Sequence, residues 1–91
     1  MIKPYRIEFV RSARKEFVKL PKQIQSKVVS ALELLATNPF SELIKFKKIK
    51  GAADLYLIRI GDYRIIYAIQ NEVLKVVVIK IGHRKEVYRG F

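Results

Sequence analysis

The sequence contains no cysteine, and it has only four glycines and three prolines among its 91 residues. Without cysteine, neither a disulfide framework nor a thiolate zinc site can form, which is typical of a protein that works in a reducing compartment. Because no Gly- or Pro-rich stretch could serve as a linker, we expect residues 1–91 to form a single domain.

Long apolar runs are also missing. The first ten residues have no uninterrupted apolar stretch of the kind found in a secretory signal peptide. No later run approaches the ~18 to 20 apolar residues that a membrane-spanning helix needs. We therefore expect a cytoplasmic protein that does not enter a membrane.

Acidic residues are scarce, because eight Asp and Glu stand against nineteen Lys and Arg, giving a net charge of +11 at pH 7. The acidic residues are scattered without the spacing of metal ligands, so we expect no metal and no cofactor. The positive excess indicates a polyanionic partner, either nucleic acid or an acidic protein; a merely solubilising surface is the alternative. With 51% hydrophobic residues, the chain is globular and not a disordered basic tail.

The first half of the chain predicts a strand and two helices. Apolar residues alternate over residues 5–10, as in a short strand. Ser12 is the predicted N-cap of a helix over residues 13–20. Pro21 can open a second helix because it has no amide hydrogen to leave unpaired. That helix is expected to end at Asn38-Pro39, because the residue before a proline avoids the helical conformation.

The second half predicts a basic β-meander. Strands are expected over residues 55–60, 63–70 and 73–81, joined in sequential antiparallel order. Residues 40–53 fit either a short edge strand or a basic loop. The predicted fold class is α+β: an N-terminal strand, a two-helix hairpin that covers one face of a sheet, and then the antiparallel meander.

The meander places two arginines opposite each other. Gly61-Asp62, between two apolar runs, is a two-residue hairpin signal, and this turn sets Arg59 directly across from Arg64. Like charges that face each other across a strand pair are destabilising. A pair that folding alone would avoid indicates a site for an anion.

A third arginine is predicted to join this pair. A second tight turn at Asn71-Glu72 would set Arg64 across from Ile79. In that register, Gly82-His83-Arg84 leaves the last strand at the end of the sheet where the arginine pair lies. Three guanidinium groups then converge, with His83 and Tyr88 beside them.

The residue types at this end suit a phosphodiester. Arginine binds two phosphate oxygens with its planar donor fork and keeps its charge, and a tyrosine ring can stack on a nucleobase. We interpret the set as a site for metal-free RNA cleavage, in which the ribose 2′-hydroxyl attacks and cations hold the charge that develops on phosphorus. RNA contacts are expected from Lys45, Lys47, Lys48, Lys50 and Lys85. A solvated basic surface is the alternative interpretation.

The sequence resembles the RelE/ParE superfamily of toxins from bacterial toxin–antitoxin modules over nearly its whole length. The most specific matching segments are Leu55–Tyr67 and Val78–Tyr88. The resemblance is closer to the RelE branch. It implies a microbial RNase-like fold, a ribosome-dependent endoribonuclease that cleaves mRNA in the ribosomal A site, and a cognate antitoxin as partner. A ParE-like inhibitor of DNA gyrase and a non-toxic nucleic-acid-binding module are the alternatives.

The resemblance also implies a role for each site residue. Arg59 matches a basic residue of its strand, and Arg64 matches the phosphate-binding arginine after the hairpin. Arg84 matches the arginine assigned to the transition-state charge or the leaving group, and Tyr88 matches the tyrosine that stacks on or orients the substrate. The chain departs from the pattern at Leu57, where some members carry a further lysine.

This departure leaves the general base to be found elsewhere, because an arginine cannot readily give up its proton. His83 is the first candidate, since an unperturbed imidazole has a pKa of ~6.5. Lys48 or Lys50 could contribute if their segment folds inward.

Overall fold

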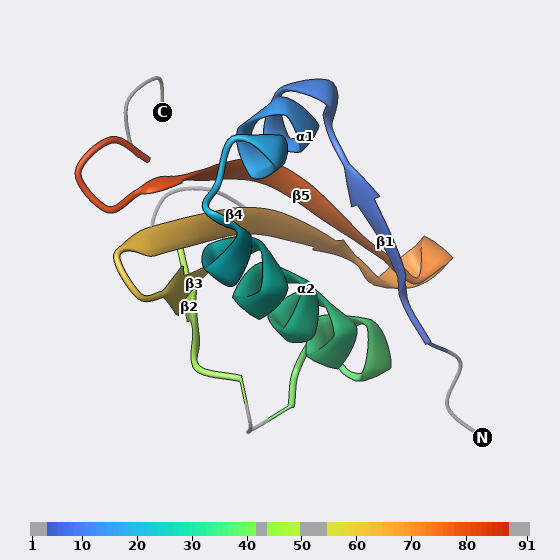
Figure 1. Ribbon diagram of the computed structural model, residues 1–91. Coiled ribbons are helices and arrows are strands. Elements are labelled where there is room, and N and C mark those ends of the chain that lie inside the picture. The colour runs from blue at the N-terminus through green and yellow to red at the C-terminus, as the bar shows by residue number, and fades with distance from the viewer. Residues whose placement is uncertain (1–3, 42–43, 50–54, 88–91) are drawn as a thin grey trace.

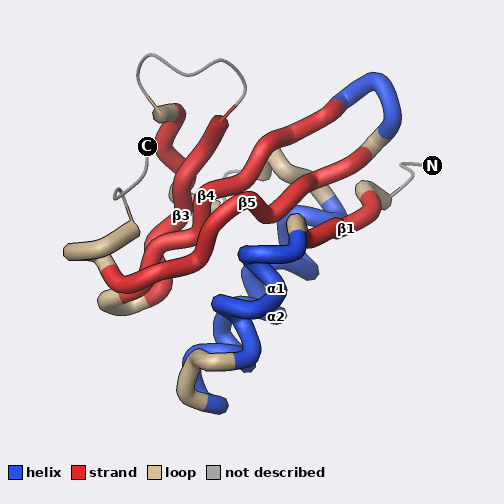
Figure 2. Tube along the Cα trace, turned by 90° about the horizontal axis from the view of Figure 1, so that it is seen from above, coloured by secondary structure: helices blue, strands red, loops and turns tan. Residues whose placement is uncertain are grey.

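The computed structural model describes residues 4–41, 44–49 and 55–87, which place two α-helices on one face of a five-stranded sheet (Figures 1 and 2). In chain order the elements are β1 Arg6–Phe9, α1 Arg11–Val18, α2 Lys22–Thr37, β2 Phe46–Lys48, β3 Leu55–Ile60, β4 Tyr63–Gln70, the 3-10 helix η1 Asn71–Val73 and β5 Lys75–His83. The strand order is β1-β5-β4-β3-β2, with β1 parallel to β5 and the other pairs antiparallel. The predicted α+β fold class is confirmed.

Helix α1 follows β1 directly, and the prediction of Ser12 as its N-cap is wrong. The helix begins at Arg11, Val10 stands at the N-cap, and no side chain caps it. The amide of Val10 donates to the carbonyl of Val78 at 3.0 Å, while its own carbonyl accepts from Arg14 at 3.0 Å. The same residue therefore ends the strand pairing and begins the helix, so no position remains between them for a capping side chain.

Helix α2 begins and ends at its proline signals. Its first residue, Lys22, comes directly after Pro21. It ends at Thr37, and Asn38 has an extended backbone with φ −159°. This conformation is the one that the following Pro39 favours for the residue before it.

The β3–β4 hairpin has the predicted turn and register. Gly61 has φ +59°, a left-handed conformation that glycine adopts without steric cost. The pairing sets Ile60 opposite Tyr63 and Arg59 opposite Arg64.

The β4–β5 connection is longer than predicted, and the register of β5 is corrected accordingly. Instead of a two-residue turn, η1 and Leu74 join the strands, so β5 begins at Lys75. A bulge between Ile66 and Tyr67 shifts the pairing further. Arg64 therefore lies opposite Gly82 and not opposite Ile79. The predicted register failed because the residues of β5 are almost continuously apolar, and such a run does not report which residues share a face.

The segment before β3 contains an edge strand, one of the two structures that its sequence allowed. Strand β2 pairs with β3 in antiparallel order, with Phe46 opposite Ile58, Lys47 opposite Leu57 and Lys48 opposite Tyr56. Period-two alternation then directs the side chains of Lys47 and Lys48 to opposite faces of the sheet.

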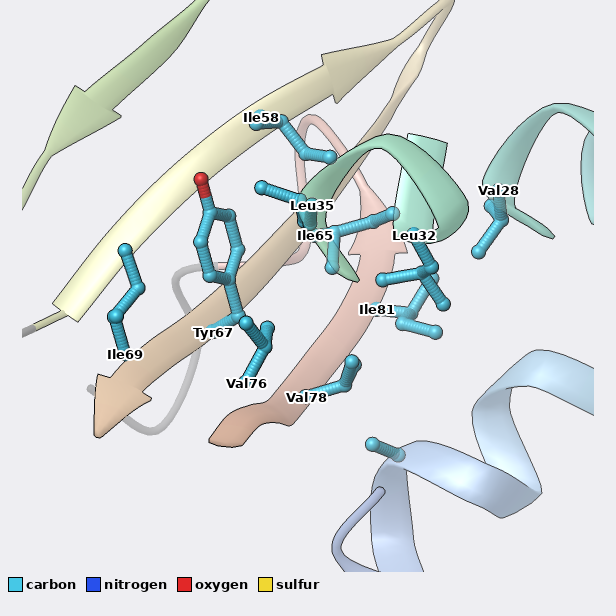
Figure 3. Packing of buried hydrophobic residues seen from close by; sticks show 11 residues of the cluster. Val28, Leu32, Leu35, Ile58, Ile65, Tyr67, Ile69, Val76, Val78 and Ile81 are labelled. Carbon is cyan, nitrogen blue, oxygen red and sulfur yellow. The ribbon is translucent and has the colours of Figure 1, made fainter. Parts of the chain in front are cut away.

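The main hydrophobic core lies between the helices and the sheet. Side chains of β3, β4 and β5 point toward α2 and α1 on this helix-covered face (Figure 3). Its buried members are Ala13, Val28, Leu32, Leu35, Ile58, Ile65, Tyr67, Ile69, Val76, Val78 and Ile81. Neither helix in the described part of the chain is long and apolar enough to cross a membrane.

Candidate functional site

The opposite face of the sheet, which carries Leu57, Arg59, Arg64 and Ile66, is covered by neither helix of the described residues, and we call it the open face. Its floor is a small separate cluster in which Leu57 and Ile66 pack with Val87. Leu57 is 4% exposed, and Ile66 and Val87 are fully buried. Val87 comes from the turn after β5, so this turn folds over the open face.

The burial of Leu57 bears on the missing lysine. Leu57, where the resemblance led us to expect a lysine in some members, packs against its strand partner Ile66 and against Val87, in an apolar setting. A leucine satisfies that setting by removing apolar area from water. The Leu57 side chain thus contributes packing to the floor of the open face. A general base for RNA cleavage would have to be another residue.

Arg59 and Arg64 lie directly opposite each other on the open face, as predicted. Arg59 is exposed, while Arg64 is half-buried. The Nη1 of Arg64 donates hydrogen bonds of 2.9 Å to the carbonyl oxygens of Gly61 and Tyr63. These bonds draw the Arg64 guanidinium toward the hairpin turn, which helps the sheet tolerate two like charges at one register position.

Arg84 is attached to the same hairpin turn. Its amide donates to the carbonyl of Asp62 at 2.7 Å, and its Nε lies 3.9 Å from Oδ1 of Asp62. The β3–β4 turn and the turn after β5 accordingly lie at one end of the sheet (Figure 1). With Gly82 opposite Arg64, the structure brings the three predicted arginines to this end, as the sequence led us to expect. Their catalytic role stays a prediction.

Sequence reasoning did not anticipate the contribution of Asp62. Its carboxylate forms an ion pair with the Arg84 side chain, and its carbonyl accepts a hydrogen bond from the Arg84 amide. The hairpin signal identified Asp62 as a turn residue, but the hydrogen bond that its carbonyl accepts from the Arg84 amide does not depend on side-chain type. Only the tertiary contact reveals it.

His83 lies on the other side of the sheet from the arginine pair. It is the strand partner of Tyr63, and the two rings meet edge to face with centroids 5.8 Å apart. Tyr63 is also the strand partner of Ile60, which packs against the helix-covered core. The Nδ1 of His83 accepts a hydrogen bond of 3.3 Å from the amide of Lys85.

The lysines predicted to bind RNA are divided between the two faces. Lys47 lies opposite Leu57 and therefore on the open face, whereas Lys48 lies opposite Tyr56 on the helix-covered side. Lys45 is exposed before β2, and Lys85 is exposed in the turn after β5. Two further predicted residues, Lys50 and Tyr88, lie outside the described residues.

A pocket of about 470 Å³ opens beside His83, between α1 and the end of β5. Its charged and aromatic lining residues include Glu16, Lys19, Tyr63, Lys80 and Glu86. Within residues 4–41, 44–49 and 55–87, no three His, Asp or Glu side chains gather where they could hold a metal ion.

Comparison with known proteins identifies the family. Residues 7–88 match the family model described as the ParE toxin of the type II toxin–antitoxin system, parDE. The chain is 32% identical over 87 residues to toxin RelG of Mycobacterium tuberculosis, an alignment that covers 94% of this chain and 98% of that protein. It is 34% identical over 92 residues to the mRNA interferase toxin RelE of Escherichia coli K12, covering 92% and 90% of the two chains.

Solved structures agree with this assignment. The archaeal RelE–RelB complex from Pyrococcus horikoshii OT3 contains a chain that superposes with a TM-score of 0.78 at 26% identity, covering 92% of this chain and 99% of that one. The chain therefore belongs to the ParE toxin family of type II toxin–antitoxin systems, within the RelE/ParE superfamily.

Proposed function

We propose that this toxin is a ribosome-dependent, metal-independent endoribonuclease that cleaves mRNA in the ribosomal A site, with the ribose 2′-hydroxyl as nucleophile. One observation carries the proposal: Arg64 and Arg84 are both bound to the β3–β4 turn, with Arg59 directly across from Arg64. A phosphodiester placed at this end of the open face would meet guanidinium groups from three segments of the chain.

The chemistry follows from the properties of these groups. Attack by the 2′-hydroxyl places additional negative charge on the phosphoryl oxygens, and pre-positioned guanidinium donors stabilise that charge without reorganising. Arg84 and Arg64 have this role in the proposal. Arg59 and Lys47 bind neighbouring phosphates, and Tyr88 stacks on a base.

Charge and relatives support the remaining parts of the proposal. A net charge of +11 suits docking on ribosomal RNA. Two relatives from enterobacteria are named as mRNA interferases, and several structural neighbours are complexes with RelB antitoxins. We propose that this toxin likewise has a cognate antitoxin, and that both act in the cytoplasm. The antitoxin would offer acidic and apolar residues to the basic surface.

Inhibition of DNA gyrase is the second candidate function. The buried Leu57 favours it, because the resemblance implies a lysine at this position in some members and a leucine cannot act as a base. The matching family model also bears the name of the ParE toxins. In this alternative the arginines bind protein or DNA and do not catalyse RNA cleavage.

The test is a cell-free translation reaction with purified toxin, in which primer extension maps the 5′ ends of the mRNA. Free mRNA and the Arg84→Ala protein serve as controls. Cuts that occur only on translated message, and only with the unaltered toxin, are expected. Intact message together with arrested growth in cells would contradict the proposal and favour gyrase. Cuts in free mRNA as well would remove the ribosome from the mechanism.

A further inference from the structure

We infer that His83 is a positioning residue and not the general base: the Nδ1 of its imidazole accepts a backbone hydrogen bond that holds the turn carrying Arg84. The effect on catalysis rests on the proposed function, whereas the structural role of the imidazole does not. This reverses the role that the sequence suggested for His83.

The turn after β5 is built around His83. Its Nδ1 accepts from the amide of Lys85 at 3.3 Å. Its carbonyl accepts from the amides of Glu86 at 2.8 Å and Val87 at 2.9 Å. The side chain and the main chain of one residue thus bind the three residues that follow Arg84, and they leave the Arg84 side chain directed outward, 55% exposed.

The other contacts of the turn show what this placement achieves. The Arg84 amide reaches the carbonyl of Asp62, and Val87 is buried on the floor of the open face. Gly82 lies next to Val87, since a Cβ there would be in ordinary van der Waals contact with the Cα of Val87 at 3.5 Å. The turn is therefore held at both ends, and the imidazole bond to Lys85 supports its middle, next to Arg84.

The His83 ring is in contact with Tyr63 and borders the pocket beside α1. Tyr63 lies edge to face against it, and Lys19, Lys80, Glu16 and Glu86 line the same pocket. Glu16 is already engaged, because its carboxylate accepts from the Ile81 amide at 3.1 Å and lies 3.5 Å from the Lys80 ammonium. The ring faces this pocket and not Arg59 and Arg64.

A catalytic base needs a lone pair within reach of the 2′-hydroxyl. A neutral imidazole has one nitrogen lone pair that can accept a proton, and in this protein the amide of Lys85 occupies it. If His83 took a proton from substrate, it would lose the bond that supports Arg84. Protonation in acid would have the same consequence, because an imidazolium ion has no acceptor.

The first measurement is the tautomer of His83, from its ring ¹⁵N resonances in the isolated toxin. His83 is the one histidine of the chain, so the signals need no assignment by mutation. We expect a neutral ring protonated at Nε2, with slow hydrogen exchange at the Lys85 amide that is lost as the ring protonates. A ring protonated at Nδ1 would overturn the inference. So would a Lys85 amide whose hydrogen exchange does not change when the imidazole is protonated.

Two substitutions separate positioning from proton transfer. His83→Asn keeps a side-chain acceptor able to bind the amide two residues later, as in an Asx-turn, whereas His83→Leu has no acceptor. If His83 positions Arg84, the Asn protein should keep Lys85 protection and cleave translated mRNA within about threefold of the unaltered rate. The Leu protein should lose both the protection and at least about tenfold in rate.

A general base behaves differently. Both substitutions would then lower the rate by about 10² to 10⁴-fold, and the pH dependence of cleavage would change in the Asn protein. That result would overturn the inference. Thermal melting of both variants checks that they fold. If the unaltered toxin does not cleave mRNA at all, the proposed function fails, but the tautomer and the Lys85 exchange still decide the role of His83.

Discussion

The two faces of the sheet are built from adjacent residues of the same strands, yet they differ in burial and in charge. On the helix-covered face, Ile65 and Tyr67 lie fully buried beneath α2. On the open face, Ile66 shares a small cluster with Leu57 and Val87, and arginines flank it. One face supplies the main core, and the other holds cations in place over a minimal apolar floor.

This division explains why like charges persist on the open face. The larger core provides most of the apolar burial that stabilises the fold, so the smaller cluster can accommodate an unfavourable arginine pair. Small proteins have only a few kcal/mol to lose. Charged residues that oppose folding are therefore best placed where they disturb the main core least.

The largest expected effect comes from truncating the two isoleucines that are adjacent in the chain but on opposite faces. We expect Ile65→Ala to lower the free energy of unfolding by about 4 kcal/mol, because the cavity lies in a core closed by helices. Ile66→Ala should lower it by about 2 kcal/mol, because the turn carrying Val87 can settle into the gap. Urea denaturation measures both, and equal losses would contradict the proposed difference between the faces.

The largest loss of activity should come from the end of the sheet where the arginines lie. We expect Arg84→Ala to reduce mRNA cleavage about 100-fold or more, the usual cost of losing one transition-state donor, and to abolish toxicity while the protein still folds and binds its antitoxin. Lys27→Ala removes an exposed cation from α2 and is the matched control, with activity near normal. Full toxicity of the Arg84→Ala protein would contradict the catalytic assignment.

A buried hydroxyl on the helix-covered face, that of Tyr67, is left without a hydrogen-bond partner among the described residues. The Tyr67 ring stacks on Tyr56 with centroids 5.9 Å apart. We expect Tyr67→Phe to raise the free energy of unfolding by about 1 kcal/mol, because the ring packing stays and the desolvated hydroxyl is removed. Tyr56→Phe, at a half-buried site, should change it less.

The same substitution has a pH signature. Burial, and secondarily the nearby Tyr56, raises the pKa of Tyr67 above its ordinary value. A group whose pKa is higher in the folded state favours unfolding once the unfolded form ionises, here above about pH 10. The unaltered protein should therefore lose about 1.4 kcal/mol per pH unit more than the Tyr67→Phe protein above that pH. Parallel stability curves above pH 10 would contradict this.

The smallest effect concerns the opposed arginines. Arg59→Leu removes one charge of the pair but keeps the bonds from Arg64 to the turn carbonyls. We expect a gain of about 0.5 kcal/mol, or roughly 2 to 4 °C in Tm, at high dilution to avoid association. Lys48→Leu is the control, because Lys48 is an exposed cation whose strand partner, Tyr56, carries no positive charge. A lower Tm for Arg59→Leu alone would mean that the pair does not oppose folding.

Local sequence signals predicted the elements that depend on neighbours in the chain. The Gly61-Asp62 turn and the opposition of Arg59 and Arg64 followed from the two-residue spacing alone. The end of α2 followed from Pro39. Each of these features is decided by backbone sterics over a few residues, which is why one sequence sufficed.

The register of β5 and the position of His83 could not be predicted in this way. An apolar run allows several registers, and the choice depends on η1, on the bulge in β4–β5 pairing and on packing against α1. Shifting the register changes which residues share a face. Arg84 was nevertheless expected at the correct end, because the end of a strand is less sensitive to register than its faces are.

By itself, the sequence determined the α+β architecture, the basic character of the molecule and the arginine pair, because turn chemistry, apolar periodicity and charge are local or additive properties. The tertiary structure alone decided that Leu57 is buried under Val87, that Asp62 holds Arg84, and that His83 lies across the sheet from Arg59. Those relations join segments more than twenty residues apart in the chain, where packing and hydrogen-bond satisfaction select the partners.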